Sequence, residues 1–540
     1  MSLGQETPEQ RTFMKTIYEN GIIVTMDPNQ PQAQSLVTEG DKILAIGSQR
    51  DMFDLAGPGC KVVDLQQGVL FPGFNETHNH LSWYAIFKTQ AFLGNCRTIA
   101  DIVKAIANHY ENTDSEVLRA YGYDDTGLLD GREITRQDLD QACSDKPVVV
   151  MHVSAHVGFL NTKALEFYNI TSNRKPPAGG TIHFDEQGLP TGRLDEHAWF
   201  EIAAKSPVPG SSDYKILLKA AIKDYNSQGF TGVHDAGLGL EDGAETVISS
   251  YKELEAENEL NLKVFISAIS HIFDKLHVRP LKSFTSMLTI GGVKLFLDGS
   301  IQVETAALKE PYLRRPDWRG EFIMDGDEFS ELVEKYHCAG HHISIHGNGD
   351  AAIEKIITAV EQAQRKCSLP SRHMLIHCQT VSKKQLLRMR GCGMVPSFFA
   401  MHIHHWGDRH ANLFLGEERA HRINPVGEAE AMGLPFTLHV DTPVRPVQAL
   451  HSIHTAVNRV TSAGKQFGGH LCCTPYSAVC AYTSMAAYCS RSEQVRGTLS
   501  PGKYADMVLL SKDITSCPKD TIKDTSVWMT ISNGRLVYES

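Results

Sequence analysis

The feature that most constrains the fold is an alternation of short apolar segments with helical patterns through the middle of the 540-residue chain. The clearest predicted strands are residues 293–297, 342–345, 374–376, 394–399 and 436–440. Helical patterns lie between them at residues 329–337, 351–365 and 382–389. Strands and helices that alternate at this spacing are typical of parallel βαβ units. The sequence therefore predicts an α/β fold, either a barrel or an open doubly wound sheet.

Both ends of the chain have the pattern of short β-strands. Strand-like runs occupy residues 21–27, 34–40, 42–47 and 61–65, and then residues 504–511, 526–532 and 535–538. Asn533-Gly534, between the last two runs, is a strong hairpin turn signal. We therefore expect a small β domain, built from residues 1–70 and 491–540, around a central domain at residues 71–490. Residues 115–228 are predicted to form an extra α/β insertion in that central domain.

The charge and the apolar content exclude several classes of protein. Lysine and arginine total 52 against 63 aspartates and glutamates, which gives a formal net charge of −11. Nucleic acids and anionic membranes attract basic surfaces, so neither is an expected partner. The chain has no apolar run of membrane-spanning length, and its polar N-terminus lacks the core of a secretory signal. The 12 cysteines form no C-x-x-C pair, so we expect free thiols in a cytoplasmic protein.

Several predicted strands end in a side chain that can bind a metal. A strand at residues 69–74 leads into Thr77-His78-Asn79-His80, and residues two apart on a strand point to the same face. Later strands contribute Lys294, His346, His377 and Asp441. Barrel enzymes collect their reactive groups at the C-terminal ends of different strands. The pattern thus predicts four histidines, a lysine and an aspartate around one point, a set that suits Zn²⁺ or a similar divalent ion.

Each member of this set also has an ordinary structural explanation. Histidines at two-residue spacing arise by chance, and a single strand-end histidine is usually buried and hydrogen-bonded. Considered alone, Lys294 would extend its ammonium group to solvent or form an ion pair. Asp441, before Thr442-Pro443, could cap a turn. The ordered set is more specific than any member, because every element follows an apolar strand in one alternating series.

Lys294 is the unusual member, because an ammonium group beside a metal dication would be repelled. Burial could lower its pKa, or CO₂ could carboxylate the amine, and either change would make it compatible with the site. A carboxylated Lys294 would supply oxygen ligands and could bridge two metal ions.

The same residues carry a resemblance to a known family. The quoted motifs are Phe71-Pro72-Gly73-Phe74, His78-x-His80, residues 229–237 (GFTGVHDAG), residues 293–300 (VKLFLDGS), Ile376-His377-Cys378-Gln379, Asp441-Thr442-Pro443-Val444 and residues 497–508 (GTLSPGKYADMV). Together they cover nearly the whole chain. The sequence resembles the amidohydrolase superfamily of metal-dependent hydrolases, and within it the YtcJ-like branch, which includes N-substituted formamide deformylases.

This resemblance implies a distorted TIM (β/α)₈ barrel with a small terminal β-sandwich domain. It implies a hydrolase of non-peptide amide C–N bonds, possessing one or two Zn²⁺ ions held by His78, His80, Lys294, His346, His377 and Asp441. Asp441 would act as the general base and acid, Lys294 would be carboxylated, the substrate would be a small molecule, and a homodimer is plausible. Two departures from the family pattern lie beside ligands: Glu76 replaces an aspartate, and Gly347-Asn348-Gly349-Asp350 replaces Ala-Ile-Gly-Asp.

The substrate pocket is less clearly marked than the metal site. Its predicted residues are His156, Asn161, Asp298, Ser300, His402, His405 and Trp406. The group from His402 to Trp406, which includes His404, is expected on a loop at the top of the barrel, with a smaller chance of a second metal site. His234 is also at a strand end, but we interpret it as structural.

Three functions remain open from the sequence. The preferred one is hydrolysis of N-substituted formamides or other N-acyl amines. A second keeps the metal site but acts on an ester, a carbamate or a cyclic imide, or decarboxylates its substrate. A third is a non-enzymatic regulatory or binding protein on a degenerate hydrolase scaffold. The intact set of six ligand candidates argues against the third.

Overall fold

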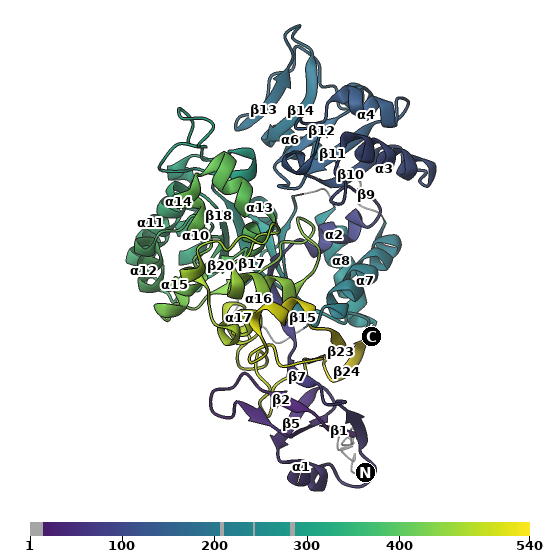
Figure 1. Cartoon of the computed structure of the whole chain (residues 1–540), viewed down its shortest axis with the longest axis vertical. Coiled ribbons are helices and arrows are strands. Elements are labelled where there is room, and N and C mark those ends of the chain that lie inside the picture. The colour runs from purple at the N-terminus through teal and green to yellow at the C-terminus, as the bar shows by residue number, and fades with distance from the viewer. Residues whose placement is uncertain (1–13, 206–209, 241–242, 281–286) are drawn as a thin grey trace, which may run out of the picture.

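The computed structural model describes residues 14–205, 210–240, 243–280 and 287–540. The first 13 residues of the polar N-terminus therefore lie outside the described residues. The longest axis of the molecule runs from the terminal strands, through a central barrel, to an inserted sheet at the opposite end (Figure 1).

Within the described residues, eight parallel strands form the central sheet, in the order β21-β20-β19-β18-β17-β16-β15-β8. They are β8 (Phe74–Asn79), β15 (Phe230–Leu238), β16 (Lys263–Ile269), β17 (Leu288–Phe296), β18 (His342–Gly347), β19 (Met374–His377), β20 (Val395–Phe398) and β21 (Thr437–Leu438). Helices cover the outside of the sheet and strand side chains fill the barrel interior, so most strand residues are buried. This arrangement is a distorted TIM-like barrel, which confirms the predicted fold class.

The barrel helices follow the predicted helical patterns closely. Three predicted segments correspond to α10 (Gly326–Cys338), α11 (Asp350–Lys366) and α12 (Lys383–Gly391). The others are α2 (Leu81–Phe87), α7 (Ser211–Ser227), α8 (Ala244–Ala256), α9 (Ser270–Lys275), α13 (Met401–Arg409), α14 (Glu417–His421), α15 (Val426–Ala431), α16 (Ala449–Asn458), α17 (Pro475–Tyr482) and α18 (Ser484–Cys489). Ser382 begins α12 with a capping box that it shares with Gln385, which explains why the helix starts there.

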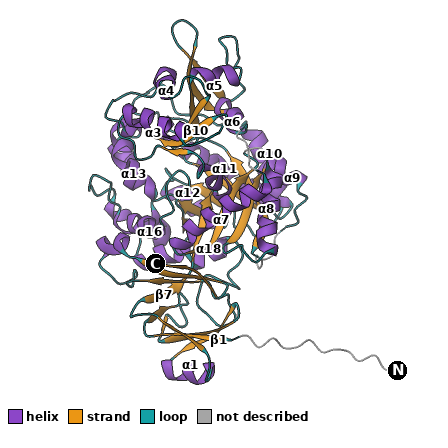
Figure 2. Cartoon of the chain, turned by 90° about the vertical axis from the view of Figure 1, so that its right-hand side faces the viewer, coloured by secondary structure: helices purple, strands orange, loops and turns teal. Residues whose placement is uncertain are grey.

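An inserted six-stranded sheet interrupts the barrel after its first strand and helix. Its order is β13 (Gly180–Phe184), β14 (Pro190–Glu196), β12 (Val157–Leu160), β11 (Val148–His152), β10 (Leu118–Tyr123) and β9 (Ala91–Phe92). The helices α3 (Ile99–Glu111), α4 (Arg136–Ala142), α5 (Thr162–Phe167) and α6 (His197–Ala203) accompany it. The sheet begins at β9, upstream of the predicted start at residue 115. Figures 1 and 2 both place it beyond one end of the barrel.

Strands from both ends of the chain share one six-stranded sheet. Its order is β24 (Arg535–Glu539), β23 (Val527–Ser532), β22 (Met507–Leu510), β7 (Val69–Pro72), β2 (Ile22–Val24) and β3 (Gln32–Ala33). A four-stranded sheet of β5 (Lys42–Gly47), β4 (Ser35–Glu39), β1 (Lys15–Glu19) and β6 (Lys61–Asp64), with α1 (Gln49–Ala56), packs beside it. Leu36, Leu70 and Met507 belong to one buried cluster, so the two sheets share apolar contacts.

The predicted first strand at residues 69–74 was wrong, because the chain changes sheets within it. β7 pairs with β22 in the terminal sheet, and β8 begins the barrel after Gly73. The Gly73 N–H donates to Asp506 O, whereas the next N–H, of Phe74, donates to Gly229 O in the barrel. A Cβ atom on Gly73 would lie 2.3 Å from Thr231 Oγ1, so the switch requires glycine here.

The prediction that all cysteines are free thiols was wrong for one pair. Cys338 and Cys367 form a disulfide, and the other cysteines in the described residues are free. Cys338 ends α10 and Cys367 caps α11, and the side-by-side packing of these helices brings together two thiols that are 29 residues apart.

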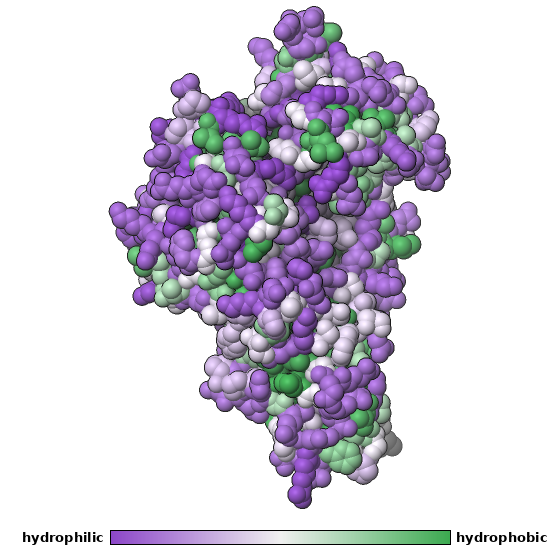
Figure 3. All heavy atoms as spheres, in the orientation of Figure 1, coloured by the Kyte–Doolittle hydropathy of each residue, from purple (hydrophilic) through white to green (hydrophobic). Residues whose placement is uncertain are grey.

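The surface seen in Figure 3 is predominantly hydrophilic, with hydrophobic side chains in scattered patches. Among the described helices, none combines the length and the apolar character that crossing a bilayer requires.

Candidate metal centre

Three of the predicted ligands meet where the first and last barrel strands end. His78 lies near the end of β8, His80 follows that strand, and Asp441 lies just beyond β21. His78 Nε2 is 3.3 Å from Asp441 Oδ1, and His80 Nε2 is 3.4 Å from the same oxygen. His377, the last residue of β19, places its Nε2 3.9 Å from Asp441 Oδ2. Asp441 is therefore the point on which three imidazoles converge.

Hydrogen bonds behind the imidazoles orient them toward Asp441. His80 Nδ1–H donates to Ala236 O at 2.6 Å, which leaves its Nε2 facing the carboxylate. His377 Nδ1 lies 3.2 Å from His439 Nε2, and His439 Nδ1 lies 2.9 Å from Ser397 Oγ. Metal-bound histidines characteristically have such a partner on the second ring nitrogen. His439 was missed in the sequence, although its position two residues before Asp441 was a signal.

Burial sets the ionisation of this cluster. Burial lowers the pKa of His78 and His377 well below the usual value, so both imidazoles are neutral. Burial opposes ionisation of Asp441, but the adjacent His78 and His80 hold its pKa well below the usual range. Neutral imidazole nitrogens beside an ionised carboxylate are the forms that bind a divalent metal.

The backbone is unusual at two of these positions. His377 has φ of 67° and Asp441 has φ of 57°, so both non-glycine residues are left-handed. Such conformations cost about 1–3 kcal/mol each and persist where the surrounding structure enforces them, often at functional sites. Here they turn the two side chains toward each other at the ends of β19 and β21.

Lys294 and His346 lie beside this cluster. Histidine and carboxylate ligand atoms lie within 4.8 Å of one another in the group of His78, His80 and Asp441 and in the group of His377, His439 and Asp441, and His346 belongs to neither. The rings of His346 and His377 are nonetheless 4.7 Å apart, and Lys294 lines the same cavity. Burial lowers the pKa of Lys294 to about 7, against the opposing effect of Asp441.

The donor set fits a divalent metal. Two buried nitrogens here, His78 Nδ1 and Lys294 Nζ, have no hydrogen-bond partner among the described residues. A buried polar atom without a partner costs about 1–3 kcal/mol, so two in one place favour a bound ligand. Nitrogen and carboxylate oxygen donors are those that Zn²⁺ and related ions prefer.

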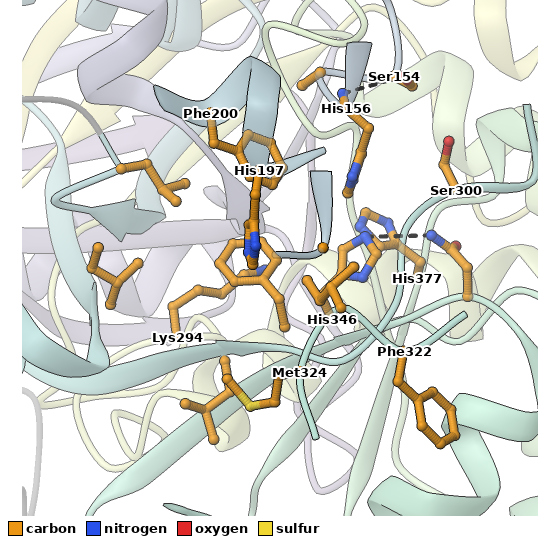
Figure 4. Close-up of a pocket in the computed structure, with 18 of the residues that line it drawn as sticks. Ser154, His156, His197, Phe200, Lys294, Ser300, Phe322, Met324, His346 and His377 are labelled. Carbon is orange, nitrogen blue, oxygen red and sulfur yellow. Dashed lines mark hydrogen bonds between the residues drawn. The ribbon is translucent and has the colours of Figure 1, made fainter. Parts of the chain in front are cut away.

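A cavity of about 860 Å³ opens over this cluster. Its base contains His78, His80, Lys294, His346, His377 and Asp441. The inserted sheet contributes Ser154 and His156, α6 contributes His197 and Phe200, and residues 321–328 supply Phe322 and Met324 (Figure 4). The cavity thus lies between the barrel and the insertion, with all six predicted ligands on its surface.

Comparison with known proteins identifies the family. The model of the amidohydrolase family matches residues 61–538. The chain belongs to the amidohydrolase family. It is 27% identical to the putative amidohydrolase YtcJ of Bacillus subtilis (strain 168), over 97% of this chain and 100% of that protein. It is 25% identical to an N-substituted formamide deformylase of Arthrobacter pascens, over 96% and 97% of the two chains.

Solved structures agree with the fold of this amidohydrolase. A crystal structure described as an uncharacterized metal-dependent hydrolase from Pyrococcus horikoshii OT3 superposes with a TM-score of 0.75 at 24% identity. The alignment covers 94% of this chain and 99% of that one. Family membership confirms the predicted resemblance and, with it, the class of hydrolase.

Three of the predicted pocket residues line the cavity, namely His156, Ser300 and His402. The prediction for Asp298 was wrong: it is fully buried below the cavity wall and accepts from the backbone N–H groups of Ala307, Asn348 and Gly349 at 3.0, 3.0 and 2.8 Å. Its Oδ1 is 3.4 Å from His346 Nδ1, so it supports a ligand candidate from behind.

The predicted loop at residues 402–406 was also wrong, because these residues lie in α13. Of this group, only His402, in the first turn of the helix, lines the cavity. Trp406 is buried elsewhere and donates from Nε1 to Asp124 Oδ2 at 3.0 Å. His405 lies against His404 and His451, away from the cavity.

The prediction that Asn161 binds substrate was wrong, because its side chain is a structural cap. Its Oδ1 accepts from Val148 N and from Ala164 N at the start of α5, at 2.9 and 2.8 Å. Its Nδ2 donates to the Cys143 and Lys146 carbonyls. His234, interpreted as structural, is buried in the barrel with its Nε2 2.7 Å from Ser267 Oγ.

Glu196 was missed in the sequence. His156 Nδ1 lies 2.8 Å from Glu196 Oε2, and both residues are buried. Burial alone would lower the pKa of His156, but Glu196 raises it above the usual value. The pair forms because β12 and β14 are antiparallel neighbours, with Val157 opposite Asp195. Nothing in the local sequence around Glu196 indicated this partner 40 residues away.

Replacing Asn161 tests its structural role. We expect Asn161→Ala to lower the free energy of unfolding by about 2–3 kcal/mol, because it removes a helix cap and leaves buried backbone groups unpaired. Urea unfolding measures this change. Asn108→Ala, at an exposed position of α3, is the matched control and should leave stability nearly unchanged. Unchanged stability in Asn161→Ala would contradict the structural assignment.

Proposed function

We propose that this amidohydrolase uses a bound divalent metal, most simply Zn²⁺, to hydrolyse amide C–N bonds other than peptide bonds in small molecules. The observation that carries the proposal is the convergence of three imidazoles on the ionised Asp441 at the base of a cavity. N-substituted formamides or other N-acyl amines are the proposed substrates. The Arthrobacter relative supports this choice, because its name describes an N-substituted formamide deformylase.

His78, His80, His377 and Asp441 would hold one metal ion, and Lys294 with His346 would extend the site toward a second. When bound, such an ion polarises a carbonyl and lowers the pKa of a water molecule toward about 7, which supplies hydroxide at neutral pH.

Asp441 is the proposed proton carrier. Its low pKa keeps the carboxylate ionised, so it can accept the proton of the attacking water. The same carboxyl group then donates that proton to the departing amine nitrogen. His78 and His80 hold the carboxylate in place through contacts to Oδ1, and the cavity walls limit access of bulk water to this transfer.

Lys294 is the proposed site of carboxylation. With a pKa of about 7, a large fraction of the amine is neutral at physiological pH and is nucleophilic. The neutral Nζ forms a bond to the carbon of CO₂ and releases one proton, which gives a carbamate. The product replaces a cation with an anionic oxygen donor, which removes the repulsion between Lys294 and a metal ion.

Metal analysis and a substrate panel test the proposed function. Protein purified without chelators should contain zinc or another divalent metal and should hydrolyse at least one N-formyl or N-acyl amine. Removal of the metal should abolish hydrolysis, and adding it back should restore the rate. The panel includes matched esters and carbamates, and preference for those would overturn the amide assignment. If the purified protein contains no metal and adding metal does not activate it, the proposal that it is a metal-dependent enzyme would be overturned.

The role of Asp441 predicts a separation between metal binding and turnover. Asp441→Asn should keep most of the metal, because the three imidazoles remain, but should lower kcat by about 10²–10⁴-fold through loss of the proton carrier. Metal content by elemental analysis and steady-state kinetics are compared with the wild type. Near wild-type kcat in this variant would exclude Asp441 as the base.

The pKa of Lys294 predicts a dependence on pH and bicarbonate. Below about pH 7 the ammonium form predominates, and it neither reacts with CO₂ nor tolerates a nearby cation. Activity after equilibration should therefore fall as the pH decreases through 7, and added bicarbonate should oppose the fall. Lys294→Ala should lose the bicarbonate response. A crystal structure with no density beyond Nζ at neutral pH would contradict carboxylation.

A further inference from the structure

One wall of the cavity carries buried polar side chains that the proposed mechanism does not use. Ser300 Oγ, Gln302 Oε1 and Asn348 Oδ1 have no hydrogen-bond partner among the described residues, although all three residues line the cavity. Ser300 is 7% exposed, Gln302 9% and Asn348 3%. Leaving such atoms without a partner costs about 1–3 kcal/mol each, so their gathering on one wall points to a ligand.

The three side chains lie beside the candidate metal centre. Asn348 Nδ2 is 3.4 Å from His346 Nε2 and donates to Gly299 O at 2.9 Å, which connects His346 to the segment carrying Ser300. Figure 4 shows His156 and Ser300 above His346 and His377, with Phe322 and Met324 below them in the view. A group bound on this wall would therefore be close to the bond that is cleaved.

The wall is held rigidly from behind. Asp298 accepts the backbone N–H groups of Asn348 and Gly349, and Thr305 Oγ1 accepts the N–H of Ser300 at 3.0 Å. Gly349 fits closely, because a Cβ there would lie 1.9 Å from Ala307 O. Preorganised polar groups of this kind lose little entropy when they bind a ligand.

The charges of the lining restrict what the wall can bind. Lys294 is the sole lysine in the lining formed by the described residues, which contains no arginine, and it belongs to the metal site. The carboxylates of Glu321, Asp325 and Glu328 also line the cavity. His156, whose pKa is raised, is paired with Glu196, so a carboxylate or phosphate on the substrate would find no unpaired lysine, arginine or protonated His156 here. The wall instead offers a hydroxyl and two amide oxygens, which hydrogen-bond to uncharged groups.

We propose that Ser300, Gln302 and Asn348 form a subsite for an uncharged hydrogen-bonding group of the substrate, a hydroxyl or a carboxamide adjacent to the scissile amide. The opposite part of the substrate is apolar and contacts Phe200, Phe322 and Met324. This subsite rests on the proposed hydrolase function and narrows its substrates to neutral N-acyl amines with one polar and one apolar end.

The test uses matched substrates that differ in one group. N-benzylglycolamide, N-benzylpropionamide and N-benzylmalonamate place a hydroxyl, a methyl and a carboxylate on the acyl side. A second series places the hydroxyl, methyl or carboxylate on the amine side of N-formyl amines. In one of the series, the hydroxyl compound should exceed its methyl partner at least tenfold in kcat/KM, and the carboxylate compound should be the poorest. Equal rates for hydroxyl and methyl compounds in both series would overturn the subsite.

Gln302→Leu and Ser300→Ala test the residues. Each should reduce the hydroxyl preference to about twofold or less, as expected for one lost hydrogen bond, with little change for the methyl compound. Because Ser300 Oγ and Gln302 Oε1 have no hydrogen-bond partner in the described part of the chain, each variant should melt no lower than the wild type. A structural role would instead lower the melting temperature and leave the preference unchanged. Gln187→Leu, exposed in the turn between β13 and β14, is the control and should change neither the preference nor the melting temperature.

A binding assay shows whether the subsite proposal or the proposed function has failed. If no compound is hydrolysed, the proposed function fails, and the same compounds are then assayed as ligands by thermal shift. A larger rise in melting temperature with the hydroxyl compounds, lost in Gln302→Leu, would support the subsite without turnover. Equal shifts for hydroxyl and methyl compounds would overturn it.

Discussion

The junction between β8 and β21 is the constraint on which the site depends. Among the described residues, no strand pairing joins β8 to β21. Side-chain contacts connect them, together with one backbone hydrogen bond just beyond the strands, from His80 N–H to Thr442 O at 2.9 Å. Thr77 Oγ1 lies 3.0 Å from Leu438 O, and Glu76 accepts from both His78 N and Val440 N at 3.2 Å. These contacts join positions more than 360 residues apart and place His78 beside Asp441.

Glu76 explains one departure from the family pattern. It lies below the candidate ligands, in the barrel interior, and does not line the large cavity. Burial raises its pKa well above the usual value, against the effect of the backbone N–H groups that it accepts. Its long side chain reaches the N–H of Val440 across the junction. The substitution therefore concerns barrel closure, whereas Asn348, in the second departure, changes the cavity wall itself.

The sequence was sufficient for the parts of the site that depend on the order of elements. Apolar runs of three to six residues between amphipathic segments predict parallel strands, and parallel strands present their C-terminal ends at one edge. Lys294, His346 and His377 could therefore be placed around one cavity without knowledge of any distance. The same argument missed the change of sheet at Gly73, because β7 and β8 are both buried and continuous in sequence.

The roles of the other residues around the site could not be predicted, because they depend on information that a single sequence does not contain. Asn161 and Asp298 follow strands as the ligands do, but nearby backbone N–H groups bind their side chains, and only coordinates show this. His402 and His405 are about one helical turn apart, and only His402 lines the cavity, a difference that their spacing in the sequence does not show. Predicting the His156–Glu196 pair and the Cys338–Cys367 disulfide requires knowing how elements distant in the sequence align with each other.

The site concentrates features that reduce stability, and the rest of the barrel compensates for them. Left-handed backbone at His377 and Asp441, a desolvated Lys294 and unpaired polar atoms all lie around one cavity. The surrounding strands are almost fully buried and pack within a large apolar core, which bears this cost. Anything that binds only the folded state recovers part of this cost, since stability rises with ligand concentration relative to Kd. The features that destabilise the free protein are thus the ones through which metal and substrate would stabilise it, so the folding of the barrel and the occupancy of the site are thermodynamically coupled.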